Sequence, residues 1–283
     1  MASHRTALRP TGSTSSRCSI QTEAQMATQN RKRGRLPGSD PTSAEDTTIR
    51  SRLLSLQKGV GCWHARVVTP QALIFDLDGT LVDSLPGIAD SLTRALASLG
   101  LPPHKRLAIR GFIGHGARGL ISRAAPAGSA EPLLAALEQA FKADYDLTWQ
   151  QGTAVYPGVA GVLAHLQRRG IALAVLTNKP HAFATSMVGS LFPALTFAAV
   201  LGQREGIPHK PDPAGAIEIA ATLGLPMSAV TLIGDSTMDI ETARSAGMQA
   251  VAVSWGYHDR VALEASMPDA LIDMPEELLA SWV

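Results

Sequence analysis

The sequence predicts an α/β fold in which helices flank a parallel β-sheet, and three observations support this fold class. Short apolar runs recur along the chain, and each of them ends at a polar cluster. Helical patterns that stop at a glycine lie between several of these runs. A chain of 283 residues with 45% hydrophobic content can bury a sizeable core. Strands that alternate with helices indicate a parallel sheet, and such sheets bind ligands beyond the carboxyl ends of their strands.

The expected strands are short continuous apolar runs, which is typical of strands buried on both faces of a sheet. In chain order they are Ala72–Phe75, Ile171–Leu176, Val230–Ile233, Ala250–Val253 and, as an edge strand, Ala270–Ile272. The helices expected between them are Val159–Arg169, Pro213–Leu223 and Met238–Ala246. A glycine follows each of these helical patterns and favours the end of the helix there.

Residues 84–153 interrupt this alternation. They carry apolar side chains at helical spacing, for example Ile88, Leu92 and Leu96, and we call them the helical insert. Because the insert begins directly after the polar loop of the first strand, it could fold as a lid over a site at that loop. The expected domains are an α/β core of residues 67–83 and 154–283, the helical insert, and an N-terminal extension of residues 1–66.

The N-terminal extension differs from the remainder in charge. It contains eleven basic and four acidic residues, against fourteen basic and twenty acidic residues in the rest of the chain. Because it is rich in polar residues and lacks apolar periodicity before Ile49, we expect it to be disordered. Beside a plain solvated tail, three interpretations stay open: the basic cluster Arg31–Arg35 is an address or a nucleic-acid contact, the Arg- and Ser-rich start is a transit peptide, or Val67 or Val68 marks the natural start.

Composition argues against several classes of protein. No run of eighteen apolar residues and no compact apolar N-terminal stretch is present, so we expect neither a membrane span nor export, and a cytoplasmic location. The two cysteines, Cys18 and Cys62, precede the first strand, so they predict neither a disulfide framework nor a cysteine metal site in the core. A formal net charge of +1 gives no general reason for a nucleic-acid or membrane partner. The oligomeric state, monomer or dimer, stays open.

Two carboxylates after the first expected strand indicate phosphoryl-transfer chemistry. Asp76 and Asp78 can take separate roles, in which one carboxylate attacks phosphorus and forms an acyl phosphate, while the other protonates the leaving oxygen and later accepts a proton from water. An anionic nucleophile that approaches an anionic phosphate needs a cation. Mg²⁺ is the expected ion, because Asp76 and Asp235 offer hard oxygen ligands.

Polar residues at other strand ends complete this hypothesis. Lys210, in the stretch His209–Pro213, supplies the positive charge that would hold both Asp76 and the transferring phosphoryl group. Thr177 and Asn178 follow the second expected strand and would donate hydrogen bonds to the phosphoryl oxygens.

These clusters occur in a recognisable order along the chain. They resemble the four ordered motifs of the haloacid dehalogenase-like hydrolase superfamily, over a region from about Pro70 to Val283. The residues that carry the resemblance are Asp76–Ser84, Thr177–Lys179, Lys210–Pro213 and Gly234–Ile240.

The resemblance implies a Rossmann-like core into which an all-α cap, here the helical insert, is placed. It implies that Asp76 is the nucleophile and Asp78 the general acid and base. It further implies that Mg²⁺ is held by Asp76, the carbonyl of Asp78 and Asp235, while Asp239 supports the metal or Lys210.

Three weaker patterns resemble the phosphoglycolate phosphatases of this superfamily. They are Phe112–Arg118 in the helical insert, Tyr156–Val159 after it and Trp255–Tyr257 near the end of the chain. This likeness implies Mg²⁺-dependent hydrolysis of a small phosphorylated metabolite, with 2-phosphoglycolate as the expected substrate. Within the insert, His115 and Arg118 are the residues that would recognise it.

Other functions stay open as alternatives. A phosphatase of a sugar or amino-sugar phosphate, a nucleotide monophosphate or pyrophosphate would share the motifs. A hexose-phosphate mutase typically carries a histidine twelve residues beyond the nucleophile, where this chain has Ile88. A non-catalytic binding module is disfavoured, because every motif residue is intact. Gly114–Gly119 matches the dinucleotide fingerprint, but no clear strand precedes it and no suitable acid follows, so no NAD is expected.

Overall fold

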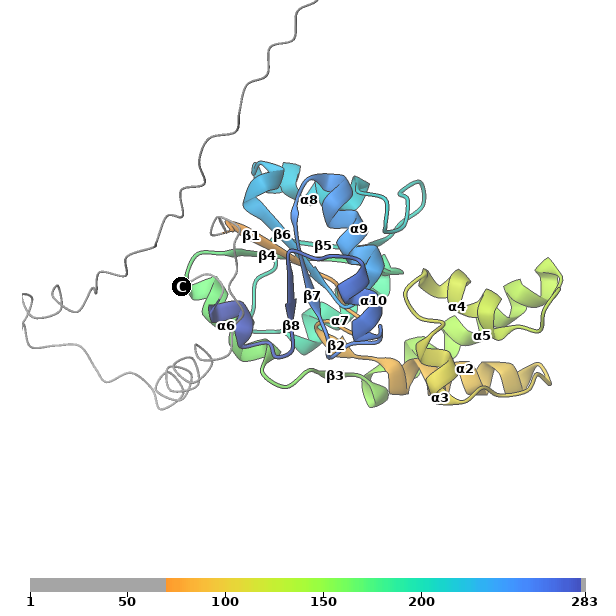
Figure 1. The fold of residues 1–283 in the computed structure, drawn as a ribbon. Coiled ribbons are helices and arrows are strands. Elements are labelled where there is room, and N and C mark those ends of the chain that lie inside the picture. The colour runs from red at the N-terminus through yellow and green to blue at the C-terminus, as the bar shows by residue number, and fades with distance from the viewer. Residues whose placement is uncertain (1–69, 281–283) are drawn as a thin grey trace, which may run out of the picture. The chain divides into compact units, whose positions relative to one another are not determined.

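The computed structural model describes residues 70–280, and Figure 1 shows their fold. The disorder predicted for residues 1–66 lies outside the described residues. The strands are β1 (Ala72–Phe75), β2 (Val82–Asp83), β3 (Ala154–Val155), β4 (Ala172–Pro180), β5 (Ala199–Gln203), β6 (Val230–Gly234), β7 (Gln249–Val253) and β8 (Ala270–Ile272). The helices are α2 (Leu85–Ser98), α3 (Arg106–Arg110), α4 (Gly116–Ala124), α5 (Glu131–Thr148), α6 (Val159–Arg168), α7 (His181–Leu191), α8 (Ala214–Leu223), α9 (Thr237–Ala246), α10 (Arg260–Ala265) and α11 (Glu277–Ala280), with 3₁₀ turns at Trp149–Gly152 and Met227–Ala229.

Six of these strands form one parallel sheet in the order β5-β4-β1-β6-β7-β8. The predicted α/β fold class is therefore confirmed, and β8 lies at the edge of the sheet as expected. In the centre of the sheet, Phe75 of β1 pairs with Val175 of β4 and with Ile233 of β6. These three strands are parallel and in register. The residues that follow them therefore meet at the carboxyl-terminal end of the sheet.

The two faces of the sheet are covered by different helices. Side chains alternate along β1, so Leu73 and Phe75 face one hydrophobic cluster while Ala72 and Ile74 face another. The first cluster contains side chains of α6, α7 and α11, and the second contains side chains of α8, α9 and α10. Figure 1 shows α8 and α9 on the side of the sheet opposite to α6. Both faces are thus apolar, which is why the strand sequences are continuously hydrophobic.

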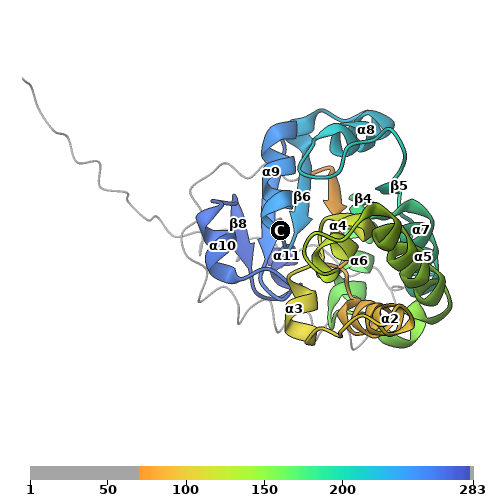
Figure 2. The same cartoon turned by 90° about the vertical axis from the view of Figure 1, so that its right-hand side faces the viewer.

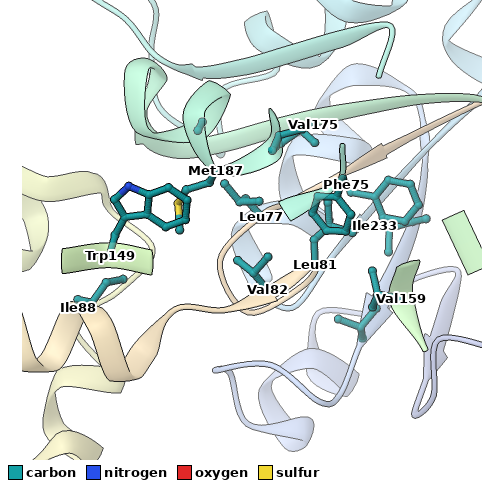
Figure 3. Packing of buried hydrophobic residues seen from close by; sticks show 14 of the residues in the cluster. Phe75, Leu77, Leu81, Val82, Ile88, Trp149, Val159, Val175, Met187 and Ile233 are labelled. Carbon is teal, nitrogen blue, oxygen red and sulfur yellow. The ribbon is translucent and has the colours of Figure 1, made fainter. Parts of the chain in front are cut away.

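The helical insert packs through its own apolar side chains and through the first cluster of the core. Helix α2 lies against α5, and α5 also contacts α4 (Figure 2). Figure 3 shows how one cluster continues from Phe75 and Val159 in the core to Ile88 and Trp149 in the insert. Burial of this shared apolar surface stabilises the insert against the core.

A pair of short strands connects the insert to the core. Val82 of β2 pairs with Val155 of β3, and Asp83 pairs with Ala154, in antiparallel register. The entering and leaving segments therefore lie side by side, and every described helix between them belongs to the insert. The division into separate core and insert domains stays a prediction.

Four elements that form or flank the main sheet, β5, α7, α10 and α11, were not predicted from the sequence, and strand β4 extends further than predicted. Strand β5 is an edge strand with four of its five residues only partly buried, so it lacks a strong apolar run. Helix α7 carries Ala, Phe, Met, Val and Leu over most of its circumference, so its apolar periodicity is weak. Strand β4 continues past Leu176 to Pro180, which pairs with Gln203 of β5 after a register shift.

None of the helices within residues 70–280 combines the length and the apolar character that crossing a membrane requires.

Candidate active site

The candidate site begins where β1 and β6 end. The Asp76 N–H donates to the carbonyl of Ile233, with 2.9 Å between nitrogen and oxygen, and Asp235 directly follows β6. After Asp76 the chain turns at Gly79, whose φ of +89° is a left-handed conformation that favours glycine. A Cβ at this position would collide with the Asp235 carboxylate. Glycine therefore lets the loop that carries Asp76 pack directly on Asp235.

Lys210 joins two of the predicted carboxylates. Its Nζ lies 2.9 Å from Asp76 Oδ1 and 2.6 Å from Asp239 Oδ1, and it donates to the Leu176 carbonyl at 3.0 Å. Its side chain is only 4% exposed. Burial by itself lowers the pKa of Lys210, but Asp239 and Asp76 outweigh it and raise the pKa above the ordinary value. Lys210 is thus a fixed cation beside the predicted nucleophile.

Asp239 positions Lys210 and begins helix α9. One carboxylate oxygen, Oδ1, accepts from Lys210, and the other, Oδ2, accepts from the Ser236 N–H at 3.1 Å and the Ser236 hydroxyl at 2.6 Å. The Asp239 N–H donates back to Ser236 Oγ at 3.3 Å, which completes a capping box. Because both Asp239 oxygens have protein partners, the structure favours Asp239 as a support of Lys210 over a direct metal ligand.

Asp76, Asp235 and Asp239 form the one group of possible metal ligands found among the described residues, with a carboxylate oxygen of each within 4.8 Å of the others. Asp76 Oδ1 is buried and, although Lys210 lies close, no hydrogen bond of good geometry reaches it. Asp235 accepts from the Thr80 hydroxyl at 3.2 Å and from the Tyr257 N–H at 2.6 Å.

The electrostatics of this group favour a cation. Burial, followed by the charge of Asp239, raises the pKa of Asp76 to about 6, although Lys210 opposes the shift. Burial, followed by the charges of Asp76 and Asp239, raises the pKa of Asp235 to about 8. A divalent ion would offset this concentration of buried negative charge, and hard carboxylate oxygens suit Mg²⁺. The residues present therefore fit the metal that the sequence predicts.

The Asp78 side chain lies outside that carboxylate group and has different partners. The Ser84 hydroxyl donates to Asp78 Oδ1 at 2.6 Å, and Lys179 Nζ donates to Oδ1 at 3.0 Å and to Oδ2 at 3.1 Å. Lys179 Nζ also donates to the Tyr145 hydroxyl at 3.0 Å. Burial lowers the pKa of Lys179, but Asp78 and Tyr145 outweigh it and raise that pKa above its ordinary value.

The role of Lys179 was missed in the sequence, where it appeared only as the third residue of a motif. A usable signal was present, because residues two apart on a strand share a face and Thr177 was already assigned to the site. The partner Tyr145 belongs to α5 of the helical insert, 34 residues away in sequence, and nothing in the local pattern of either residue reveals the contact.

Thr177 and Asn178 have distinct positions at the end of β4. The Thr177 hydroxyl accepts from the Lys179 N–H at 3.3 Å, and Thr177 lines the cavity that the site encloses. Asn178 Nδ2 donates to the carbonyls of Gly114 at 2.9 Å and Lys210 at 3.1 Å, and its Oδ1 accepts from the Lys210 N–H at 2.9 Å. The Asn178 amide thus links β4, the Lys210 loop and the insert. The phosphoryl contact predicted for this residue stays a prediction.

These side chains surround a cavity of about 60 Å³. Its polar wall is formed by Asp76, Asp78, Thr177, Asn178, Lys179, Lys210 and Ser236. Its apolar wall is formed by Ile88, Ile113, Ala117, Leu120 and Phe141 of the insert and by Phe183 and Met238 of the core. The volume has room for only a few water-sized groups, which favours a small substrate.

His115 and Arg118, the residues predicted to recognise the substrate, are not among the residues that line this cavity. The Arg118 guanidinium forms ion pairs with Glu131 and, at 3.3 Å, with Glu138. A ring nitrogen of His115, Nδ1, lies 2.8 Å from Arg123. Both side chains are thus held by neighbours within the insert, and their role in recognition stays a prediction.

Tyr257, from one of the weaker patterns, connects the insert to the Asp235 loop. Its hydroxyl accepts from the N–H groups of Ser84 at 2.8 Å and Leu85 at 2.9 Å, where α2 begins. Its own N–H donates to Asp235, and its carbonyl accepts from Arg110 Nε at 2.6 Å. One residue therefore fixes the start of the insert relative to a predicted metal ligand.

Comparisons with known proteins agree with this arrangement. Residues 73–253 match the haloacid dehalogenase-like hydrolase family. A phosphoglycolate phosphatase of Pectobacterium atrosepticum is 33% identical over 76% of this chain and 93% of its own length. A phosphoglycolate phosphatase of Rhodospirillum rubrum is 39% identical over 66% of this chain and 81% of its own length. The solved structure of a haloacid dehalogenase-like family hydrolase from Streptococcus pneumoniae superposes with a TM-score of 0.69 at 26% identity, covering 76% of this chain and 99% of that chain.

Proposed function

The chain belongs to the haloacid dehalogenase-like hydrolase family, and we propose that this phosphatase hydrolyses a small phosphate monoester, foremost 2-phosphoglycolate, through an aspartyl-phosphate at Asp76. The observation that carries the proposal is the cluster of Asp76, Asp235 and Asp239, in which Lys210 contacts Asp76 and Asp239, while Asp76 and Lys210 line a small cavity. A carboxylate with a raised pKa beside a fixed cation is suited to nucleophilic attack once a metal binds.

The reaction would proceed in two steps. Asp76 attacks phosphorus, a bond forms between its oxygen and phosphorus, and the ester bond breaks as Asp78 gives a proton to the leaving oxygen. A water molecule then attacks phosphorus and gives a proton to Asp78, so the bond to Asp76 breaks and phosphate leaves. Lys210 holds Asp76 in place, and the Thr177 hydroxyl donates to a phosphoryl oxygen.

Asp76 and Asp235 are the residues that would hold Mg²⁺, together with the Asp78 carbonyl that the family resemblance implies. When bound, the ion would neutralise charge between the nucleophile and the phosphate. Asp239 would act indirectly, because its two oxygens hold Lys210 and the start of α9.

Two observations support a small ester as the substrate. The cavity measures about 60 Å³, and the two relatives from Pectobacterium and Rhodospirillum are named phosphoglycolate phosphatases. Ile88 lines the cavity where hexose-phosphate mutases typically carry a histidine, so this position offers no proton-transfer group. A phosphatase of another small metabolite is the second candidate. A cytoplasmic location and the lack of nucleic-acid or membrane partners stay predictions from composition.

The proposal is tested by measuring phosphate release from a panel of phosphorylated metabolites, with Mg²⁺ and with excess EDTA. We expect Mg²⁺-dependent turnover with the highest kcat/KM for 2-phosphoglycolate. Higher kcat/KM for a sugar phosphate or a nucleotide would move the substrate assignment to that class. Full activity in EDTA would refute the metal assignment.

A further inference from the structure

Lys179 is a second buried cation in the cavity, and the two-step reaction above does not use it. Among the described residues that line the cavity, Lys179 and Lys210 are the basic ones. Lys210 is committed to Asp76 and Asp239 on the side of the nucleophile. Lys179 instead lies beside Asp78, the group that would meet the leaving oxygen, and its side chain is 4% exposed.

We propose that Lys179 determines substrate specificity by binding a carboxylate carried one carbon away from the ester oxygen of the substrate. This inference rests on the proposed function and names the chemical feature that the leaving group must have. The substrate carboxylate would replace Asp78 as the acceptor of one of the two hydrogen bonds that the Lys179 ammonium donates to Asp78.

Covalent geometry supports this placement. In a phosphoester of a 2-hydroxy acid, a single carbon separates the ester oxygen from the carboxylate. When Asp78 lies within hydrogen-bond reach of the ester oxygen, a cation about 3 Å from Asp78 lies within reach of that carboxylate. Lys210, on the side of the nucleophile, already bonds Asp239 and the Leu176 carbonyl, so it is the less suitable partner.

The contacts of Lys179 allow such an exchange. An ammonium has three N–H donors, and in the structure these meet Asp78 Oδ1, Asp78 Oδ2 and the Tyr145 hydroxyl. Asp78 thus accepts two of the three hydrogen bonds. One of them could hold Asp78 in place while Lys179 donates the other to the substrate carboxylate. The Tyr145 ring supports the cation from the insert, with Nζ 4.7 Å from the ring centroid.

The remaining cavity wall strengthens the inference. The insert contributes Ile88, Ile113, Leu120 and Phe141, which offer no polar group to an anion, and Tyr145, whose hydroxyl is bonded to Lys179. The candidate anion-binding residue of the insert, Arg118, is paired with two glutamates outside the cavity. Without Lys179, a carboxylate in this cavity would have Lys210 as its remaining cationic partner among the lining residues, and Lys210 is already bonded to Asp76 and Asp239.

The test compares 2-phosphoglycolate with ethyl phosphate, which has nearly the same size but no carboxylate, in wild type and in Lys179→Met. We expect the wild type to prefer 2-phosphoglycolate. We expect the variant to lose about 10- to 100-fold of that preference, chiefly through KM, because a charge-assisted hydrogen bond is lost. Lys142→Met is the matched control, since Lys142 pairs with Glu138 away from the cavity, and it should keep the wild-type preference. Lys179→Arg should retain part of the preference.

A binding measurement separates this inference from the proposed reaction. Calorimetry on the wild type compares 3-phosphonopropionate, which carries the carboxylate, with propylphosphonate, which does not, and neither can be hydrolysed. We expect tighter binding of the carboxylate compound in wild type and nearly equal binding of the two compounds in Lys179→Met.

Equal binding of the two compounds by the wild type would overturn the inference even if Lys179→Met fails to fold. An equal loss of kcat/KM on both esters in a folded variant would also overturn it, because it would show that Lys179 only positions Asp78. Absence of turnover with a preserved binding preference would count against the proposed reaction and not against the Lys179 site.

Discussion

In the α/β core, the charged residues of the site are buried and bonded to one another, whereas in the helical insert the charged residues lie at the surface and the cavity wall is apolar. Lys210 bridges Asp76 and Asp239 with a side chain that is 4% exposed. Arg118 of the insert pairs with Glu131 and Glu138, and its side chain is 39% exposed. Substitution of a charged site residue in the core therefore leaves a buried charge without its partner. Substitution of a charged residue on the insert should change the free energy of unfolding only slightly.

The two regions also differ in what they contribute to the cavity. The core supplies most of the polar side chains, and the insert supplies apolar side chains and Tyr145, whose hydroxyl accepts from Lys179. The core would thus perform the chemistry, while the insert excludes water and shapes the space for the leaving group. Changes confined to one region test this division, and those in the core should have the largest effects.

The largest effect is expected for Asp76→Asn in the core. A neutral amide cannot attack phosphorus and binds a cation poorly, so turnover should fall on the order of 10⁴-fold or more. Phosphate release measures the loss, and the thermal midpoint serves as the control for folding. Turnover within about tenfold of wild type would exclude Asp76 as the nucleophile.

Removal of the metal should have an effect of similar size. Activity should disappear in excess chelator and return with Mg²⁺, while Ca²⁺ should inhibit. The larger ion takes roughly six to eight ligands and would draw both Asp76 oxygens into its coordination sphere. Initial rates at fixed substrate and varied ion concentration measure this, and equal rates with both ions would contradict it.

Asp78→Asn should lower the rate by roughly 10²- to 10⁴-fold for alkyl phosphates, because their leaving oxygen needs a proton. Aryl phosphates leave more easily, so their loss should be smaller. The ratio of the two rates in wild type and variant is the measurement. An equal loss on both substrate classes would remove Asp78 from the role of general acid.

The metal-free protein should lose stability as the pH rises. The folded-state pKa is raised from 3.8 to about 6 for Asp76 and from 3.8 to about 8 for Asp235. Between pH 3.8 and these values the folded state binds more protons than the unfolded state, so the free energy of unfolding decreases as pH rises through this window.

Mg²⁺ should offset this loss most strongly above about pH 8, because both carboxylates are then largely ionised in the folded protein. At a Mg²⁺ concentration of 100 times its Kd, the thermal midpoint should rise by roughly 5 to 10 °C. Thermal melts in chelator and in Mg²⁺ at several pH values measure both trends. A metal-induced shift that does not grow with pH would contradict the charge argument.

The smallest effect is expected for Arg118→Ala in the insert. Its partly exposed ion pairs are worth about 1 kcal/mol or less, so the thermal midpoint should change by only a few degrees. Because Arg118 does not line the cavity, KM for 2-phosphoglycolate should stay close to wild type. A selective rise in that KM would show that the insert repositions Arg118 when substrate binds, and would support the specificity role predicted from the sequence.

The sequence by itself determined the fold class and the identity of the motif residues. Apolar runs such as Ala72–Phe75 and Val230–Ile233 could be recognised because a strand buried on both faces must be continuously hydrophobic. Once the strands are parallel and in register, Asp76 and Asp235 must meet at one edge of the sheet. Strand β5 and helix α7 were not predicted, because neither segment shows a distinct apolar periodicity.

The sequence predicted the contact of Lys210 with Asp76, but only the tertiary structure decided the other polar partners of the motif residues. Lys179 pairs with Asp78, 101 residues away, and with Tyr145 of the insert, while the Asn178 amide bonds Gly114 and Lys210. Sequence spacing decides which edge or face a side chain occupies, because that follows from the local period of the strand or helix. Its partner depends on how distant elements pack, and this packing is set by burial of apolar surface over the whole cluster that core and insert share.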